Sequence, residues 1–198
     1  MAKPQDVIKA MVSLLHRDHL KSLGFGKTGS TWTRSLEWPQ VINIQLSRFN
    51  SSEEAKFTVN IGVSIPPLRA IWGGPPQKGP LKEYDCDLRA RIGSLLPDKH
   101  DKWWDVTETS DAARLAQAVF HDIDQHALPW LDKLTVYQGL AQEFNSRKQL
   151  AKAAIVFHLA GDQAMAVATM AEAFAAANPV ALPMLRRLAR TCGIPVAD

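Results

Sequence analysis

The sequence predicts an α+β fold in which an antiparallel β-sheet packs against helices and is followed by an α-helical C-terminal tail. Three observations lead to this prediction. Apolar residues recur at helical spacing over residues 5–20, alternate with polar residues over residues 31–65, and return to helical spacing after Ser110. The alternating segments are joined by short connections, which are typical of an antiparallel meander.

The first helix is expected over residues 5–20. Pro4 suits the first turn of a helix, and the apolar side chains that follow form one stripe: Val7, Ile8, Met11, Leu14, Leu15 and Leu20. The glycine-rich residues 24–27 then turn the chain. This segment is not expected to bind phosphate, because Lys21 stands where the motif needs its first glycine and because a helix precedes it where a strand is needed.

Three strands are predicted, at residues 31–36, 41–48 and 56–65, and their alternation gives the sheet one apolar face. The opposite face collects uncharged polar side chains: Thr31, Thr33, Ser35, Asn43, Gln45, Ser47, Thr58, Asn60 and Ser64. A solvated face normally carries more lysine and glutamate. Either another part of the chain covers this face and satisfies its hydrogen bonds, or the face is an open surface for a ligand or partner.

The next part of the chain changes pattern twice. Residues 66–82 are rich in proline and glycine and are predicted to form a long irregular loop, a kind of segment that is often functional or mobile. Residues 83–96 combine alternation with helical spacing, so we expect a strand or bend that passes into a short helix. Residues 103–106 are expected to form a further short strand.

The remainder of the chain is predicted to be helical. Ser110 is expected to cap the first of these helices, and Pro129 to interrupt it near its end. Four further helices are expected at about residues 135–146, 148–160, 162–177 and 180–191.

Several short sequence motifs occur along the first part of the chain. They are Gly24-Phe25, Val41-Ile42-Asn43-Ile44-Gln45-Leu46-Ser47-Arg48, Phe57-Thr58-Val59-Asn60-Ile61-Gly62, Tyr84-Asp85-Cys86, Arg89-x-Arg91-Ile92-Gly93 and Trp103-Trp104. In this order they resemble the bacterial family called domain of unknown function 4304 over about residues 5–130. The family name records no activity, so the resemblance implies no catalytic residue. We therefore expect an α+β domain of this uncharacterised family at residues 1–130 and an α-helical extension at residues 131–198.

The extension carries a second pattern. Its small and apolar residues resemble a single tetratricopeptide helical hairpin at these positions: Leu150, Ala153, Ala154, Phe157, Ala166, Met170, Ala173 and Phe174. Arrays of this type need about three units to be stable. The alternative is a generic pair of alanine-rich helices.

Composition and charge restrict the class of protein. The net charge is +3, and residues 1–100 carry 14 basic and 9 acidic side chains, which favours an anionic partner. No apolar run reaches 18 residues and residues 1–6 lack an apolar leader core, so no membrane span is expected. Cys86 and Cys192 have neither metal-site nor disulfide-framework spacing, which suits a reducing compartment, and we expect the bacterial cytoplasm.

No motif in the sequence predicts catalysis. His16 and His19, and likewise His121 and His126, lack the spacing of a metal site. The sequence contains no nucleophile elbow and no motif that suggests an activated cysteine. No catalytic residue, metal ion or cofactor is therefore predicted.

The candidate binding residues fall into three groups. Trp72, in the predicted loop, is the best candidate for a contact residue, because tryptophan and arginine dominate binding hot spots. The densest charged cluster would share one face of an extended segment, and it either binds a ligand or forms an ion-pair network that orients the segment: Asp85, Asp87, Arg89 and Arg91. The remaining candidates belong to the sheet or its strand ends: Arg48, Asn43, Gln45 and Asn60.

Three functions remain open at this point. The leading hypothesis is a non-enzymatic binding or interaction module with a protein partner. One alternative is a small hydrolase that uses Asp85 and Asp87 with Arg89 or Arg91. Another is a nucleic-acid-binding protein, in which tryptophans interleaved with arginines stack on bases. The sequence predicts no oligomeric state.

Overall fold

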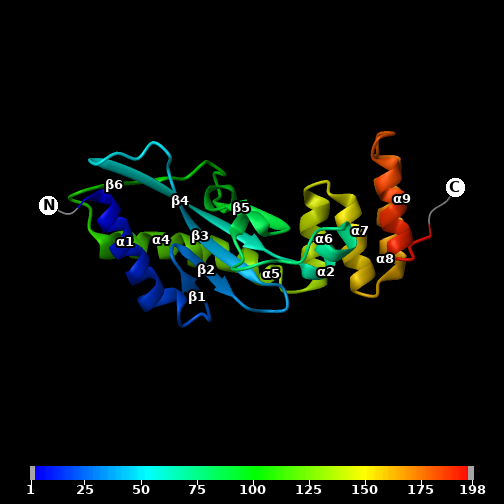
Figure 1. The fold of residues 1–198 in the computed structure, drawn as a ribbon, viewed down its shortest axis with the longest axis horizontal. Helices are drawn as coiled ribbons and strands as arrows, with labels where there is room; N and C mark the ends of the chain where they lie inside the picture. The colour runs from blue at the N-terminus through cyan, green and yellow to red at the C-terminus, as the bar shows by residue number, and fades with distance from the viewer. Residues whose placement is uncertain (1–2, 196–198) are drawn as a thin grey trace. The chain divides into compact units, whose positions relative to one another are not determined.

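The computed structural model describes residues 3–195. The chain divides into two compact units (Figure 1). Unit 1 comprises Met1–Ser64 and Gly79–Asp132, and unit 2 comprises Ile65–Lys78 and Lys133–Asp198. The division after Asp132 lies close to the boundary that the sequence suggests, whereas the segment Ile65–Lys78 groups with the helical part of the chain.

Unit 1 is built on an antiparallel sheet whose strands follow one another in space in the order β1-β2-β3-β4-β5. A sixth strand, β6, also pairs with β4, so β5 lies along the end of β4 and β6 along its beginning. The strand bounds are Gly26–Thr28 (β1), Thr31–Arg34 (β2), Gln40–Leu46 (β3), Glu54–Val63 (β4), Leu88–Arg91 (β5) and Trp104–Thr107 (β6). The predicted antiparallel sheet is confirmed.

The strand β1 was not predicted from the sequence, which suggested a glycine-rich turn over residues 24–27. The structure pairs Gly26–Thr28 with β2 through a two-residue turn at Gly29 and Ser30. Gly29 has a φ of 62°, a left-handed conformation that glycine adopts without steric cost. Three exposed residues carry no alternation, so nothing in the hydrophobic pattern could reveal this strand.

Two helices pack side by side against the apolar face of the sheet, α1 (Pro4–Leu15) and α4 (Ala112–Asp122) (Figure 1). The core between these layers includes the fully buried side chains of Met11, Leu15, Trp32 and Phe57. Burying one such apolar side chain contributes about 1.5–3 kcal/mol. The sheet and these two helices therefore form one core.

The start of α4 corrects one prediction. Its N-cap is Asp111 and not Ser110, because the Asp111 carboxylate accepts hydrogen bonds from the backbone N–H groups of Ala113 and Arg114 at 2.8 and 3.2 Å. The Ser110 hydroxyl instead accepts from the Thr107 N–H at 2.9 Å and closes the preceding turn.

Helix α4 continues through a π-helical turn, Ile123–Ala127, into α5 (Leu128–Lys133). The wide turn lies directly before Pro129. A proline ring clashes with the carbonyl four residues earlier and donates no hydrogen bond, and a π turn relieves both problems. The predicted interruption at Pro129 is therefore a local widening of the helix.

Residues 66–72 correct another prediction, because they form a helix, α2 (Pro66–Trp72), within the segment expected to be an irregular loop. Its two prolines occupy the first turn, where the missing N–H groups have no helical partner in any case. Gly73 ends the helix with a φ of 88°. Further along the chain, a 3₁₀ turn at Glu83–Asp85, strand β5 and helix α3 (Ile92–Leu95) confirm the expected passage from bend and strand into a short helix.

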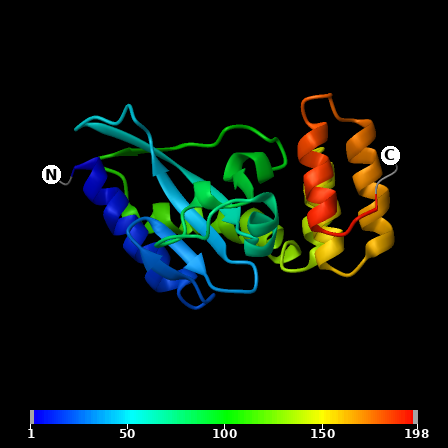
Figure 2. The ribbon, with the colours of Figure 1, turned by 45° about the vertical axis from the view of Figure 1, so that its right-hand side comes forward.

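Between residues 134 and 195, unit 2 contains four helices, as predicted from the helical period of the sequence. They are α6 (Tyr137–Ser146), α7 (Leu150–Leu159), α8 (Gln163–Ala175) and α9 (Leu182–Thr191). Consecutive members pack on each other, and Figure 2 shows α8 and α9 as antiparallel neighbours. Asp162 caps α8 by accepting a hydrogen bond from the Met165 N–H at 3.1 Å.

Candidate functional site

The polar face of the sheet contains a row of amide and guanidinium side chains that strand register brings together. Asn43 on β3 lies opposite Asn60 on β4, and Asn60 lies opposite Arg91 on β5. Gln45 is the next β3 residue on the same face, and its Oε1 accepts a 2.7 Å hydrogen bond from Asn60 Nδ2. The alternation therefore places four of the predicted site residues on one surface.

One part of this face is covered by unit 1 itself. Gly62 allows the Lys82–Cys86 segment to approach, because a Cβ at position 62 would lie 2.6 Å from the Cys86 sulfur. Nearby, the buried Thr58 hydroxyl donates to the Lys102 carbonyl at 2.8 Å. Both interpretations of the polar face thus hold in part, since its Gly62 side is covered and its Gln45 side is open.

The open part forms a groove of about 690 Å³, which we call the Arg91 groove. Its lining residues are Gln45, Leu46, Ser47, Arg48, Phe49, Lys56, Arg91 and Trp103. A smaller pocket of about 190 Å³ continues it past Arg91. The residues of this smaller pocket are Asn60, Glu83, Arg89, Ala90 and Arg91. Five of the sequence candidates therefore border one continuous surface: Arg48, Gln45, Asn60, Arg89 and Arg91.

An arginine and an aromatic ring stand together at each of two places in the Arg91 groove. The Arg91 guanidinium lies 5.4 Å from the centre of the Trp103 ring, and the Arg48 guanidinium lies 4.7 Å from the centre of the Phe49 ring. Phe49 is 80% exposed, which is unusual for a large apolar side chain. Each pair offers an apolar surface next to a positive charge.

Three of the four basic residues along this surface have carboxylate partners. Arg91 pairs with Asp101 at 3.0 Å, Lys56 pairs with Asp105 at 2.9 Å, and Arg89 pairs with Glu83. Arg48 is different: among residues 3–195 no carboxylate lies within ion-pairing distance of it. Arg48 is therefore the cation of the groove that is available to an incoming anion.

Asp101 organises the Trp103 side of the groove. Its carboxylate accepts a 2.9 Å hydrogen bond from the Trp103 indole nitrogen and two hydrogen bonds from Arg91. These hydrogen bonds, first from Trp103 and then from Arg91, lower the pKa of the Asp101 carboxyl below its ordinary value. The carboxylate stays charged and holds the ring and the guanidinium in one orientation.

The remaining members of the charged cluster lie outside the groove lining. The Asp85 carboxylate accepts a 3.0 Å hydrogen bond from the Lys82 N–H and so caps the 3₁₀ turn. Asp87 precedes β5, and its N–H donates to the Val63 carbonyl at 3.0 Å. Arg89 and Arg91 border the groove from β5, while neither aspartate is among its lining residues.

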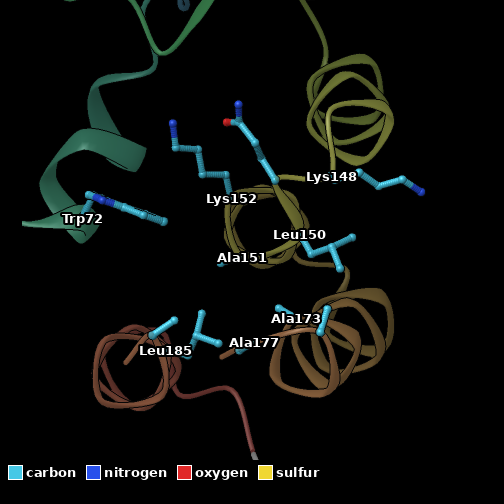
Figure 3. Close-up of a pocket in the computed structure, with 11 residues that line it drawn as sticks. Trp72, Lys148, Leu150, Ala151, Lys152, Ala173, Ala177 and Leu185 are labelled. Atoms are coloured by element: carbon cyan, nitrogen blue, oxygen red, sulfur yellow. The ribbon is translucent and has the colours of Figure 1, made fainter. Parts of the chain in front are cut away.

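Trp72 lies in unit 2, at the end of α2, and is half-buried. It lines a separate pocket within unit 2 together with residues of α7, α8 and α9 (Figure 3). It is therefore not part of the Arg91 groove.

Five of the eight residues that line the groove are not among the candidates from the sequence: Leu46, Ser47, Phe49, Lys56 and Trp103. Phe49 follows the end of β3, where the strand parity that assigns residues to a face no longer applies. Trp103 precedes β6 and reaches the groove through the loop that also carries Asp101. The position of an exposed aromatic residue next to an arginine, Arg48-Phe49, is the one local pattern that could have indicated this site.

The cysteines are both buried and unpaired. Burial, followed by the neighbouring carboxylates of Asp87 and Glu83, raises the pKa of the Cys86 thiol to about 12. Since the thiolate is the reactive form, Cys86 is not an activated nucleophile at neutral pH.

The described part of the chain holds neither a cluster of metal ligands nor a membrane-spanning helix. Over residues 3–195, no group of three or more histidine, cysteine, aspartate or glutamate side chains is arranged to hold a metal ion. None of the helices in that range combines the length and the apolar character needed to cross a bilayer.

A family model described as domain of unknown function (DUF4304) matches residues 16–133. The match includes all six strands, α4 and every residue that lines the Arg91 groove. No curated protein and no solved structure gives a significant match.

Proposed function

The chain belongs to the family described as domain of unknown function (DUF4304), and we propose that its unit 1 is a non-enzymatic binding module that holds a segment of a partner protein in the Arg91 groove. The observation that carries this proposal is the pairing of Arg48 with the exposed ring of Phe49 at the open side of the groove. Arginine and the aromatic residues, phenylalanine included, are enriched at protein–protein interfaces relative to the rest of the surface.

The lining of the groove suits a short extended segment with one carboxylate. Arg48 offers a bidentate site for that carboxylate. The rings of Phe49 and Trp103 offer apolar surfaces for a side chain of the segment. The Gln45 amide offers hydrogen bonds to the main chain of the segment. The groove thus combines the apolar anchor and the polar rim that are typical of protein interfaces.

Nucleic acid is the less favoured occupant, because most of the positive charge at the groove is neutralised. Arg89, Arg91 and Lys56 are each paired with a carboxylate of unit 1. A surface that binds a polyphosphate backbone depends on unneutralised lysines and arginines. The rings of Phe49 and Trp103 could still stack on bases, so a nucleic-acid control belongs in the test.

The expected setting is the bacterial cytoplasm. The support for this part of the proposal is that Cys86 and Cys192 are free and buried and that the resemblance is to a bacterial family. Thiols of this kind persist in a reducing compartment.

The proposal is tested by affinity capture from a lysate of the native cell with the wild-type chain, Arg48→Ala and Arg114→Ala as baits. Arg114 is an exposed arginine on α4, outside the groove, and its substitution removes the same charge. We expect wild type and Arg114→Ala to retain the same protein and Arg48→Ala to lose it. Equal retention by all three baits would reject the groove as the binding site.

A further inference from the structure

Unit 2 contains a pocket of about 370 Å³ where the ends of four helices meet (Figure 3). It is lined by Trp72, Lys148, Gln149, Leu150, Ala151, Lys152, Ala173, Ala176, Ala177, Ala181 and Leu185. Trp72 comes from the end of α2, Leu150 from the start of α7, Ala173 from α8 and Leu185 from α9. The pocket is thus part of the folded helical unit and lies entirely within it.

The sequence explains why a hollow remains at this place. The wall opposite Trp72 is built largely from alanine, the smallest side chain with a Cβ, so the helix ends leave space between them. In Figure 3 the Trp72 ring projects from α2 toward α7, and Ala151 and Leu185 flank the same space. The Trp72 carbonyl accepts a 3.1 Å hydrogen bond from Arg187 on α9, which ties the end of α2 to that helix.

Unit 2 carries an excess of positive charge. Residues 65–78 and 133–198 carry nine lysines and arginines and four aspartates and glutamates, a difference of +5. No carboxylate is among the residues that line the pocket. The Lys152 ammonium lies 5.6 Å from the centres of both the Trp72 and the Phe144 rings, so a cation stands directly beside the apolar wall.

The two lysines of the lining are not equivalent. In Figure 3 Lys152 extends on the Trp72 side of α7, whereas Lys148 points away from Trp72. Lys152 is therefore the cation that an anionic group in the pocket would meet.

The wall of the pocket also holds an unsatisfied acceptor. The Gln149 side-chain oxygen is shielded from solvent and has no hydrogen-bond donor among residues 3–195. Buried acceptors without a donor are rare in folded proteins. Because this oxygen is shielded, a donor on a bound segment could reach it only after the Gln149 side chain turns toward the pocket.

We infer that this pocket docks an acidic segment of a partner protein, which inserts one apolar side chain beside Trp72 and places a carboxylate near Lys152. The charge excess of unit 2 selects an acidic partner and speeds its approach. The apolar wall selects the inserted side chain, because a polyanion without an apolar group gains nothing from it. This site is independent of the Arg91 groove, so either proposal can fail without the other.

The test is a fluorescence-anisotropy titration of the full chain with a labelled peptide, Glu-Asp-Glu-Phe-Glu-Asp. Two comparison peptides replace either Phe by Ser or every acid by its amide. We expect saturable binding of the first peptide alone, with affinity that falls as salt rises. Trp72→Ala is expected to weaken binding about 30-fold, as for a hot-spot tryptophan, and Lys152→Gln about fivefold, as for a single exposed ion pair.

Lys133→Gln is the matched control, because it removes the same charge from an exposed lysine of unit 2 outside the pocket lining. It is expected to leave the affinity within about twofold of wild type. Three results would overturn the inference. They are no binding of any of the three peptides, equal affinity for the Phe and Ser peptides, or an equal loss of affinity in Lys152→Gln and Lys133→Gln. Binding of a labelled single-stranded DNA oligonucleotide in place of the peptides would overturn it as well. If Trp72→Ala does not fold, the lysine pair and the three peptides decide the outcome.

Discussion

The guanidinium of Arg91 lies 5.4 Å from the centre of the Trp103 ring, and both side chains donate hydrogen bonds to the same carboxylate, that of Asp101. The Asp101 carboxylate therefore holds one arginine–aromatic pair of the Arg91 groove in position. The other pair, Arg48 and Phe49, is exposed, and in the described part of the chain no carboxylate forms an ion pair with Arg48.

Acidification is expected to release Trp103 from Asp101. Hydrogen bonds to the carboxylate lower the folded-state pKa of Asp101, so this interaction stabilises the fold above the unfolded pKa of about 3.9 and is lost as the pH falls through the lower, folded value. The indole N–H resonance of Trp103 in a ¹H–¹⁵N NMR spectrum should shift over this acidic range. In Asp101→Asn the same resonance should show no such transition, and an unchanged titration there would contradict the assignment.

Gly62→Ala is expected to destabilise unit 1 by about 1–3 kcal/mol, the usual cost of forcing an extra methyl group into a packed site. The new Cβ would lie 2.6 Å from the sulfur and 2.7 Å from the Cβ of Cys86. Urea denaturation measures the decrease in the free energy of unfolding. The double variant with Cys86→Gly should recover part of it, because it removes both clashing atoms; strict additivity of the two changes would show that the contact is not the cause.

The Cys86 thiol is expected to resist modification in the folded protein. Burial raises its pKa to about 12, so the neutral thiol dominates at pH 8 and a thiol reagent should react only after denaturation. The raised pKa also predicts that stability, complete below the unfolded pKa of about 8.5, falls as the pH rises toward 12. Cys86→Ala should lose this contribution and show a flatter alkaline limb, whereas rapid native-state labelling of Cys86 would contradict its buried placement.

Asp111→Ala is expected to cost about 1 kcal/mol, because it removes the side chain that caps α4. Ser110→Ala should cost less, since the Ser110 hydroxyl binds a turn N–H and not the helix end. Chemical denaturation measures the free energy of unfolding of both variants and shows which loses more stability. A larger loss of stability in Ser110→Ala than in Asp111→Ala would indicate that Ser110 is the N-cap, as the sequence suggested.

The sheet could be predicted from the sequence because period-two alternation is a local property of each strand. The same alternation predicts that Gln45 and Asn60 share one face, and strand register adds Arg91 to it. Helix α2 was not predicted, because the segment was assigned as a loop from its content of proline and glycine. In the structure Pro66 and Pro67 begin a helix and Gly73 ends it. The same residue types mark loops and helix ends.

The completed groove could not be predicted, because its contacts come from residues at strand ends and in loops. Asp101 reaches Arg91 from ten positions away through an irregular segment. One interpretation of the charged cluster is an ion-pair network, and the structure adds partners from outside the cluster: Arg91 forms a salt bridge with Asp101, and Arg89 forms one with Glu83. Such pairings depend on the path of the chain, which hydrophobic periodicity does not determine.

The role of Arg48 and Phe49 as the contact residues of unit 1 is tested most directly by the affinity-capture comparison, extended with Phe49→Ala and with a nuclease-treated sample. Arg48 and Phe49 are exposed, so both variants should keep the wild-type stability within about 0.5 kcal/mol. We predict that a partner protein retained by wild type and by Arg114→Ala, with and without nuclease, is lost from both groove variants. Retention of that partner by Arg48→Ala and Phe49→Ala, or its disappearance after nuclease treatment, would contradict the account.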